Sequence, residues 1–235
     1  QYSDMPFVIM LDEDENGYKA GRFLRASDLG MSGENNEWKP VIQDKLSQQL
    51  LVPNGTMGQR WEEGKKWNLK LETEDGTPIN PMLSMAESDY HVETIQFPYF
   101  DSSGDGIFER PIATRAIQLA NGEEVKIATV YDLMTSQYGV QRFEHELEAT
   151  SYDDASSKYT PAWQEQITGI KKELVTKVAK EFAQNAIDTG GRSMIIMGAG
   201  INHWFNSDTI YRSILNLVLL CGCLLYTSDA ADEED

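Results

Sequence analysis

The sequence has 235 residues, with 20 Lys and Arg against 38 Asp and Glu, and carries a formal net charge of −18 at pH 7. This acidic excess disfavours nucleic acid and anionic membrane surfaces as partners of the whole chain, because both are polyanions. The length allows one large domain or two small ones with a sizeable hydrophobic core. The longest apolar stretch, residues 214–225, is about half the length of a membrane span, so no direct membrane span is expected.

The first 150 residues are predicted to form an irregular, mixed α+β flank rather than an independent core. Pro6–Leu11 is an apolar run that predicts a strand, and Ala20–Leu29 has the pattern of a short amphipathic helix. Asn121-Gly122 separates two strand-like runs and predicts a hairpin over Gln118–Val130. A helix is expected to follow, from Val130 to about Tyr138.

Two groups of residues are weak candidates for metal ligands. Asp101, Asp105 and Glu109 resemble a calcium loop in composition, but they lack the length and spacing of an EF-hand, so a solvated turn is favoured. Cys221 and Cys223 are too few for a disulfide framework. A metal site would need ligands from elsewhere, and two buried thiols are the preferred interpretation.

From residue 151 to residue 223 the pattern changes to that of an α/β cofactor-binding unit. Thr160 and Pro161 are a favourable N-cap and first helical residue. The predicted order is helix, helix, buried strand, glycine loop and second apolar segment, over Pro161–Thr168, Lys171–Ala186, Ser193–Met197, Gly198–Gly200 and Ile210–Leu220. This alternation indicates part of a doubly wound α/β domain, in which helices cover a parallel sheet.

The segment from Gly198 to Trp204 is the strongest candidate site. Gly198 and Gly200 have no side chains, which lets the backbone approach a ligand closely. Asn202 and His203 follow where the predicted strand ends, and open parallel sheets bind ligands at such ends. The alternative is a tight strand-to-helix turn with a hydrogen-bonded histidine. The third glycine of a dinucleotide fingerprint is missing, so a nicotinamide site is disfavoured.

The sequence offers no catalytic residues of a familiar kind. His91 and His145 lie in polar or acidic surroundings and are expected to be solvated. Paired catalytic carboxylates, a nucleophile elbow and a Walker loop are all missing from the sequence. No catalytic residue and no metal ligand is therefore assigned.

Six blocks of sequence resemble one protein family. They are Tyr2–Pro6, Ala20–Leu29, Trp61–Leu69, Ala149–Asp154, Tyr159–Gly169 and Gly191–Trp204. In order, and from Gln1 to Cys223, they resemble the catalytic alpha subunits of membrane-bound respiratory nitrate reductases, which are molybdopterin oxidoreductases. Six blocks in order are more specific than any single motif in the chain.

The resemblance implies an internal fragment of a quinol-linked enzyme that reduces nitrate to nitrite by oxygen-atom transfer. It implies a molybdenum bis(molybdopterin guanine dinucleotide) cofactor and a 4Fe-4S cluster, and it places their protein ligands upstream of Gln1. The implied partners are an iron–sulfur beta subunit and a haem b membrane gamma subunit, at the cytoplasmic face of the cell membrane. Gly198, Gly200, Asn202 and His203 would then face the pterin, with Asn202 and His203 as hydrogen-bonding groups.

Residues 224–235 depart from the family and have the composition of a non-native tail, which we expect to be disordered. Two rival hypotheses stay open. One is a nitrite oxidoreductase or another oxyanion reductase with the same cofactor. The other is a non-enzymatic α/β binding or assembly module that folds cooperatively without a cofactor. A fragment, in contrast, is expected to be inactive alone, to expose apolar surface and to aggregate.

Overall fold

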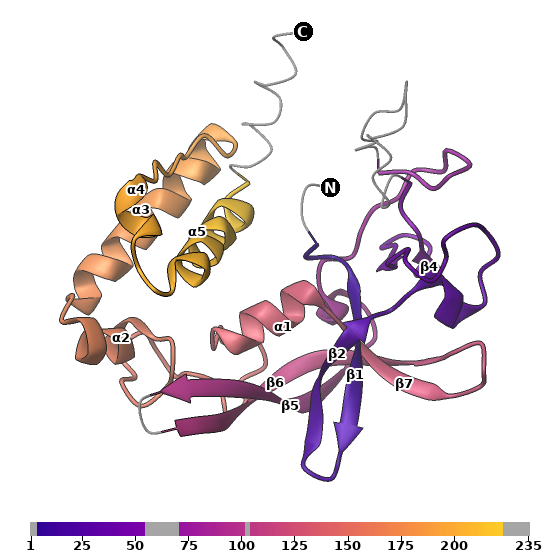
Figure 1. Cartoon of the computed structure of the whole chain (residues 1–235), viewed down its shortest axis with the longest axis horizontal. Helices are drawn as coiled ribbons and strands as arrows, with labels where there is room; N and C mark the ends of the chain where they lie inside the picture. The colour runs from indigo at the N-terminus through magenta and orange to yellow at the C-terminus, as the bar shows by residue number, and fades with distance from the viewer. Residues whose placement is uncertain (1–3, 55–70, 102–103, 223–235) are drawn as a thin grey trace, which may run out of the picture. The chain divides into compact units, whose positions relative to one another are not determined.

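The computed structural model describes residues 4–54, 71–101 and 104–222. The chain divides into two compact units between Trp163 and Gln164, and Figure 1 draws both of them. The domains predicted from the sequence, residues 1–150 and 151–223, are divided at a different position from these two units, and that division stays a prediction. The predicted tail, residues 224–235, lies outside the described residues.

Five strands of the first unit close into a barrel in the order β1-β2-β5-β6-β7. Their bounds are Val8–Asp14 (β1), Gly17–Phe23 (β2), His91–Asp101 (β5), Gly104–Gln118 (β6) and Glu124–Thr129 (β7). Neighbouring strands are antiparallel, except that β2 and β5 pair in parallel through Tyr18 with Ile95 and Lys19 with Gln96. Closing the sheet in this way gives each strand a neighbour on both sides over part of its length.

The barrel has a hydrophobic core, which differs from the expectation of an irregular flank without one. Two groups of buried side chains form this core: Val8, Met10, Leu24, Val41, Met85, Ala113 and Ile127, and then Leu11, Ile95, Phe97, Phe108, Ile112 and Ala128. The expectation rested on the many turn residues between positions 30 and 90. It missed the barrel because the strands that pair, such as β1 and β7, are far apart in sequence.

Short elements lie between the strands of the barrel or directly after the last of them. They are the 3-10 turns η1 (Ala26–Leu29) and η2 (Met85–Glu87), the paired strands β3 (Ile42–Gln43) and β4 (Leu50–Leu51), and the helix α1 (Val130–Gln137). Helix α1 begins where β7 ends, and the Thr129 side chain accepts the backbone N–H of Asp132 at 3.0 Å. This N-cap fixes the start of α1 and confirms the helix that was predicted there.

The local predictions for the barrel strands are mostly confirmed. The strand predicted at Pro6–Leu11 is β1, and the hairpin predicted around Asn121-Gly122 joins β6 to β7, with Gly122 at a φ of +84°. The helix predicted at Ala20–Leu29 is wrong. Its first half belongs to β2, where Ala20 pairs with Leu11 of β1, because pairing along a neighbouring strand outweighs a weak local helix preference.

Helices make up the second unit. They are α2 (Pro161–Thr168), which crosses the boundary between the units, α3 (Lys172–Thr189), α4 (Ala199–Asn202) and α5 (Ser207–Leu220). The Thr160 hydroxyl accepts the N–H of Trp163 at 3.1 Å, which confirms the predicted cap of α2. The second predicted helix is confirmed as α3, and Gly190, at a φ of +68°, ends it.

The structure of this chain does not form the strand predicted at Ser193–Met197, because the segment has no strand pairing. A strand needs partners for its backbone N–H and C=O groups, and the described residues of the helical unit include no other strand. The chain is a mixed α/β protein with a sheet and helices, as expected. A doubly wound parallel sheet is not among its described elements.

Candidate functional site

The predicted cofactor loop lies between α3 and α5. Gly198 precedes α4, Gly200 lies inside α4, Asn202 ends it and His203 follows, and all four residues are exposed. A Cβ atom added to either glycine would meet no other atom within 4 Å. The structure therefore keeps the four predicted residues together in one short loop, with open space beside both glycines.

A tyrosine that the sequence did not single out belongs to this loop. The Tyr211 hydroxyl, in the first half of α5, donates a hydrogen bond to the side-chain oxygen of Asn202. The bond ties the end of α4 to α5 and uses the side-chain oxygen of Asn202, not its NH₂ group, which is a donor. Asn202 and Tyr211 come together only because the chain turns back between α4 and α5. A search for sequence motifs does not detect this contact.

The extended segment before the loop is held at its first residue. Ser193 is buried, its hydroxyl donates to the Phe182 carbonyl oxygen at 3.1 Å, and it accepts a hydrogen bond from Asn185 at 2.8 Å. Met194 and Ile196 are 72% and 84% exposed. An apolar segment that was expected to be buried on both faces therefore lies open in this chain.

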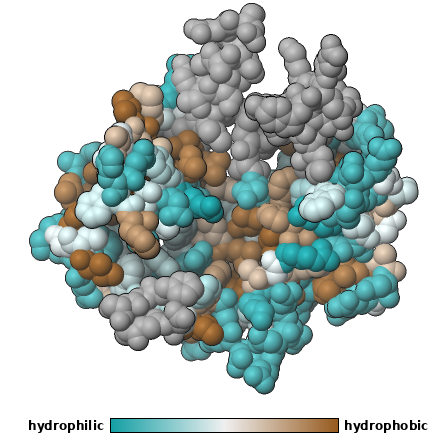
Figure 2. Space-filling model, in the orientation of Figure 1, coloured by the Kyte–Doolittle hydropathy of each residue, from teal (hydrophilic) through white to brown (hydrophobic). Residues whose placement is uncertain are grey.

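The helical unit buries almost no apolar side chain. Among its described residues only Ala186, Gly191 and Ser193 are buried, and Phe205, just after the loop, is 99% exposed. Figure 2 shows apolar surface open on the face that it draws. Burial of large apolar side chains is the main term that offsets the entropy of ordering a chain, and the described residues of this unit gain little of it.

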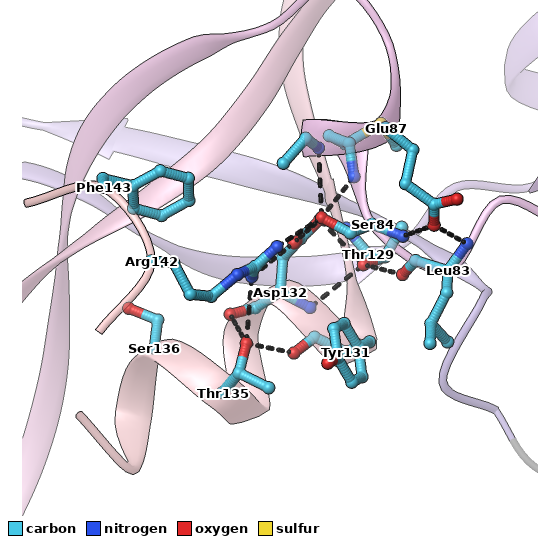
Figure 3. Close-up of polar contacts among 12 residues, drawn as sticks. Leu83, Ser84, Glu87, Thr129, Tyr131, Asp132, Thr135, Ser136, Arg142 and Phe143 are labelled. Carbon is cyan, nitrogen blue, oxygen red and sulfur yellow. Dashed lines mark hydrogen bonds and ion pairs between the residues drawn. The ribbon is translucent and has the colours of Figure 1, made fainter. Parts of the chain in front are cut away.

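A separate group of polar residues is buried in the barrel unit around Asp132, near the start of α1 (Figure 3). The Asp132 side chain is fully buried, and its Oδ1 accepts hydrogen bonds from the Ser84 hydroxyl at 2.6 Å and from Arg142 at 2.8 Å. Its Oδ2 accepts the backbone N–H of Met85 at 2.8 Å and lies 2.8 Å from the Thr129 hydroxyl oxygen. Both carboxylate oxygens are thus fully used inside the protein.

Arg142 completes this cluster from the loop that follows α1. Its guanidinium also donates to the hydroxyls of Ser84 and Thr135, and it lies 5.6 Å from the ring centre of Tyr131 and 5.2 Å from that of Phe143. The cluster joins η2, α1 and the loop after α1. The Asp132 carboxylate and the Arg142 guanidinium bind each other and the neighbouring hydroxyl groups. We therefore infer that the cluster stabilises the fold and takes no part in a reaction.

An aromatic cluster includes side chains of the hairpin formed by β5 and β6. Phe97 and Phe108 stack across the two strands at 5.5 Å, and the cluster continues through Tyr99, Tyr138, Tyr159 and Trp163. Two cations lie against it: the Arg110 guanidinium is 5.2 Å, and the Lys158 ammonium 5.7 Å, from the Phe108 ring centre. The sequence analysis missed both cations, because β6 and the loop that carries Lys158 meet only in the fold.

Arg110 is a buried cation with incomplete hydrogen bonding. It is 8% exposed, and it donates to the Leu147 carbonyl oxygen at 3.0 Å and to the Ser157 hydroxyl at 3.2 Å. Its Nε is buried and has no hydrogen-bond partner among the described residues. Burial lowers the pKa of Arg110 and, next to it, raises the pKa of the Tyr159 phenol.

The remaining expectations concern metals and membranes. Among the described residues no cluster of three or more His, Cys, Asp or Glu side chains could hold a metal ion. The side chains of Asp101 and Asp105 and the whole of Cys223 lie outside the described residues, and Cys221 is partly buried. Within the described ranges, no helix combines the length and apolar character that a membrane span requires.

The sequence is similar to curated nitrate reductase alpha chains. It is 52% identical over 223 residues to the nitrate reductase alpha chain of Bacillus subtilis. The aligned region covers 94% of this chain and 18% of that protein. It is 41% identical over 238 residues to the respiratory nitrate reductase 1 alpha chain of Escherichia coli, with 95% and 19% covered. It is 40% identical over 232 residues to the nitrate reductase alpha subunit of Mycobacterium tuberculosis, with 95% and 18% covered. No family model matches the chain.

These similarities cover nearly all of this chain but a small part of each relative. The chain spans about a fifth of the length of the curated relatives it matches. Identity of 40% or more over a stretch this long confirms the resemblance that six short blocks predicted. The chain therefore belongs to the family of nitrate reductase alpha chains and corresponds to one segment of them.

Proposed function

We propose that this chain is part of the catalytic subunit of a quinol-linked nitrate reductase, which reduces nitrate to nitrite at a molybdenum bis(molybdopterin guanine dinucleotide) centre. The 52% identity to the Bacillus subtilis nitrate reductase alpha chain, over 94% of this chain, carries the proposal. The segment alone is expected to be inactive. The iron–sulfur cluster and the molybdenum would be held by residues elsewhere in the alpha subunit.

Gly198, Gly200, Asn202 and His203 are proposed to bind the pterin part of the cofactor. The open space beside both glycines suits a flat ligand that approaches the backbone closely. The Asn202 NH₂ group and the exposed His203 imidazole offer hydrogen bonds to the nitrogen and oxygen atoms of such a ring system. When bound, the molybdenum centre supplies the oxygen-atom transfer, and these residues bind the cofactor and orient it.

The exposed apolar surface of the helical unit supports its place inside a larger subunit. Ser193–Met197 is proposed to become a buried strand when strands from the rest of the alpha chain pair with it, which would complete a doubly wound sheet. Met194 and Ile196, now 72% and 84% exposed, would then be covered. An iron–sulfur beta subunit and a haem b gamma subunit are the proposed partners, at the cytoplasmic face of the membrane.

A chimera tests the proposed activity. Residues 1–222 of this chain replace the matching segment of the Bacillus subtilis alpha chain, and the assembled enzyme is assayed for nitrite formation with a reduced dye as electron donor. We expect nitrate reduction and a normal molybdenum content. A chimera that assembles with full molybdenum content but forms no nitrite would contradict the proposal, and turnover of a different oxyanion would favour the rival oxyanion reductase.

The same chimera tests the cofactor residues. Gly200→Ala places a methyl group where the pterin would approach, so we expect a lower molybdenum content, while the same substitution in the 235-residue chain leaves its melting temperature unchanged or raises it. His203→Ala is expected to shift the molybdenum reduction potential. His91→Ala, at an exposed histidine of β5, is the matched control and should change neither quantity.

A further inference from the structure

The turn between β1 and β2 carries an Asn-Gly pair, Asn16-Gly17. Asn16 is exposed, and Gly17 begins β2 as the partner of Asp14. The backbone N–H of Asn16 donates to the Asp14 carboxylate at 2.8 Å, and its carbonyl oxygen accepts a hydrogen bond from the Gln96 side chain. Within the described ranges, the side-chain amide of Asn16 has no hydrogen-bond partner. The amide is therefore free to rotate toward the backbone of the next residue.

An asparagine that precedes a glycine can lose ammonia without an enzyme. The Gly17 backbone nitrogen would attack Cγ of Asn16, forming a new C–N bond as the bond from Cγ to the side-chain nitrogen breaks. The proton of the Gly17 N–H leaves with that nitrogen as ammonia, and a cyclic imide remains. Water then opens the imide at either carbonyl, which gives aspartate or isoaspartate. A glycine allows this approach because it has no Cβ, and a Cβ added to Gly17 would meet only the Gln96 side chain, at 3.9 Å.

A second Asn-Gly pair, Asn121-Gly122, is held in place on both reacting sides. The side-chain oxygen of Asn121 accepts the Glu123 N–H at 2.9 Å, and its NH₂ group donates to the Glu123 carboxylate at 3.2 Å. The Gly122 N–H donates to the Leu119 carbonyl oxygen at 2.9 Å. The third pair, residues 54–55, lies partly outside the described residues. Asn121 must therefore give up several hydrogen bonds before it can react, whereas the Asn16 amide gives up none.

The Asn16-Gly17 pair lies next to the shortest strand pairing of the barrel. β2 meets β5 through only two residue pairs, and Gln96 belongs to one of them. The same Gln96 side chain donates to the Asn16 carbonyl oxygen. Isoaspartate carries the main chain through the former side chain and lengthens it by one atom. At this turn the extra atom would move the carbonyl away from Gln96 and shift β2 along β5, because the turn sets the register of the strands that follow it.

We propose that Asn16-Gly17 is a site of spontaneous deamidation, and that isoaspartate formed there weakens the pairing of β2 with β5. The exposed, unpaired amide and the open space at the glycine favour this pair over Asn121-Gly122. Aspartate alone adds one negative charge to a turn in which Asp12–Glu15 are already all acidic. Isoaspartate also changes the path of the main chain, so the age of the chain would appear as a loss of barrel stability.

Peptide mass spectrometry after incubation of the 235-residue chain at mildly alkaline pH tests the site. Trypsin gives two peptides with a single asparagine each, residues 1–19 with Asn16 and residues 116–126 with Asn121. In the folded chain we expect the 1–19 peptide to deamidate about tenfold or more faster, because hydrogen bonds must break before Asn121 reacts. In guanidinium chloride the two rates should become similar, because neither turn is then folded. Equal rates in the folded chain, or a difference that persists in denaturant, would overturn the assignment.

The effect on the barrel is measured on the same aged samples. Isoaspartate is detected by enzymatic methyl transfer, and the aged chain should melt at a lower temperature than the fresh chain. Asn16→Gln is the matched control, because the longer side chain cyclises far more slowly, and it should keep its melting temperature on ageing. Fresh Asn16→Asp has the added charge without the altered main chain and should melt above the aged chain. An aged chain that contains isoaspartate and melts like the fresh chain would refute the weakening of the β2–β5 pairing.

Discussion

The Arg142 guanidinium donates to Oδ1 of Asp132 at 2.8 Å, and the Asp132 side chain has no exposed surface. This pair connects the start of α1 to the loop that leads away from its end. The Ser84 hydroxyl, from η2, bonds to both partners. One buried polar cluster therefore holds η2 against both the start of α1 and the loop after it, and replacing Asp132 should loosen all three segments.

Asp132→Asn should destabilise the barrel unit by about 3–5 kcal/mol, because it leaves the partly buried Arg142 charge without its counter-ion. Urea unfolding followed by tryptophan fluorescence measures this loss. The exposed pair between Lys19 and Asp14 is the control, and Lys19→Gln should cost far less, because water screens an exposed ion pair. Equal losses of unfolding free energy in the two variants would mean that burial does not increase the contribution of the Asp132–Arg142 pair to stability.

Tyr159 makes the barrel unit sensitive to alkaline pH. An unfolded tyrosine loses its proton near pH 10, and burial raises the pKa of Tyr159 above that value in the fold. The folded state then binds the proton more tightly, so this contribution to stability is present below about pH 10 and is lost as the pH rises through the folded pKa. Tyr159→Phe should reduce the alkaline loss of stability.

Urea midpoints measured between about pH 8 and about pH 11 would reveal this difference. Tyr152→Phe, at a side chain that is 61% exposed, serves as the control and should follow the unmodified chain. A Tyr159→Phe curve that runs parallel to that of the unmodified chain over this range would refute the assignment.

Gly21→Ala should disrupt the pairing of β1 with β2. A Cβ atom at this position would lie 2.7 Å from the Met10 carbonyl oxygen and 2.6 Å from Oδ1 of Asp12, and the backbone atom cannot swing away. We expect a loss of about 1–3 kcal/mol, typical of overpacking, measured by thermal unfolding. Gly198→Ala has open space and should be tolerated, so similar losses at both positions would argue against the steric cause.

Phe205→Ser should make the 235-residue chain more soluble without lowering its stability. The side chain is 99% exposed, so its removal gives up no packing inside the chain. The binding of a hydrophobic dye and the tendency to aggregate should both fall. The control is Phe108→Ser, at a ring that is 7% exposed, which should unfold the barrel unit. Unchanged dye binding in Phe205→Ser would mean that the dye binds to apolar surface elsewhere in the chain.

Features fixed by neighbouring residues were predictable from the sequence. Asn121-Gly122 selects a tight turn, and Thr160 with Pro161 starts a helix, because backbone conformation and capping act within a few residues. Ala20–Leu29 was misassigned because β2 is set by its pairing with β1. The barrel as a whole depends on pairing between strands that are far apart in sequence, so local sequence patterns did not predict it.

The candidate site was predictable only in its contiguous part. Gly198, Gly200, Asn202 and His203 share one loop, as their adjacency required. The contact of Tyr211 with Asn202 and the meeting of Arg110 with Lys158 at Phe108 arise from the path of the chain in space. The apolar character of Ser193–Met197 foretold burial, but the segment lies open here, since hydropathy does not say which strands supply the cover.

The pairing of β1 with β7 has a consequence for how the barrel is made. Val8 of the first strand pairs with Thr129 of the last, and β2 reaches β5 only through a short parallel pairing. During synthesis, β1 and β2 are made before β5 and β7, the strands that pair with them, and a two-stranded hairpin without such partners is at best marginally stable. The barrel can close only after β7 has emerged, so its contact order is high and its folding should be slow. A growing chain would then be most prone to misassociate before Thr129 is in place, which makes the early hairpin a natural point for a chaperone to act.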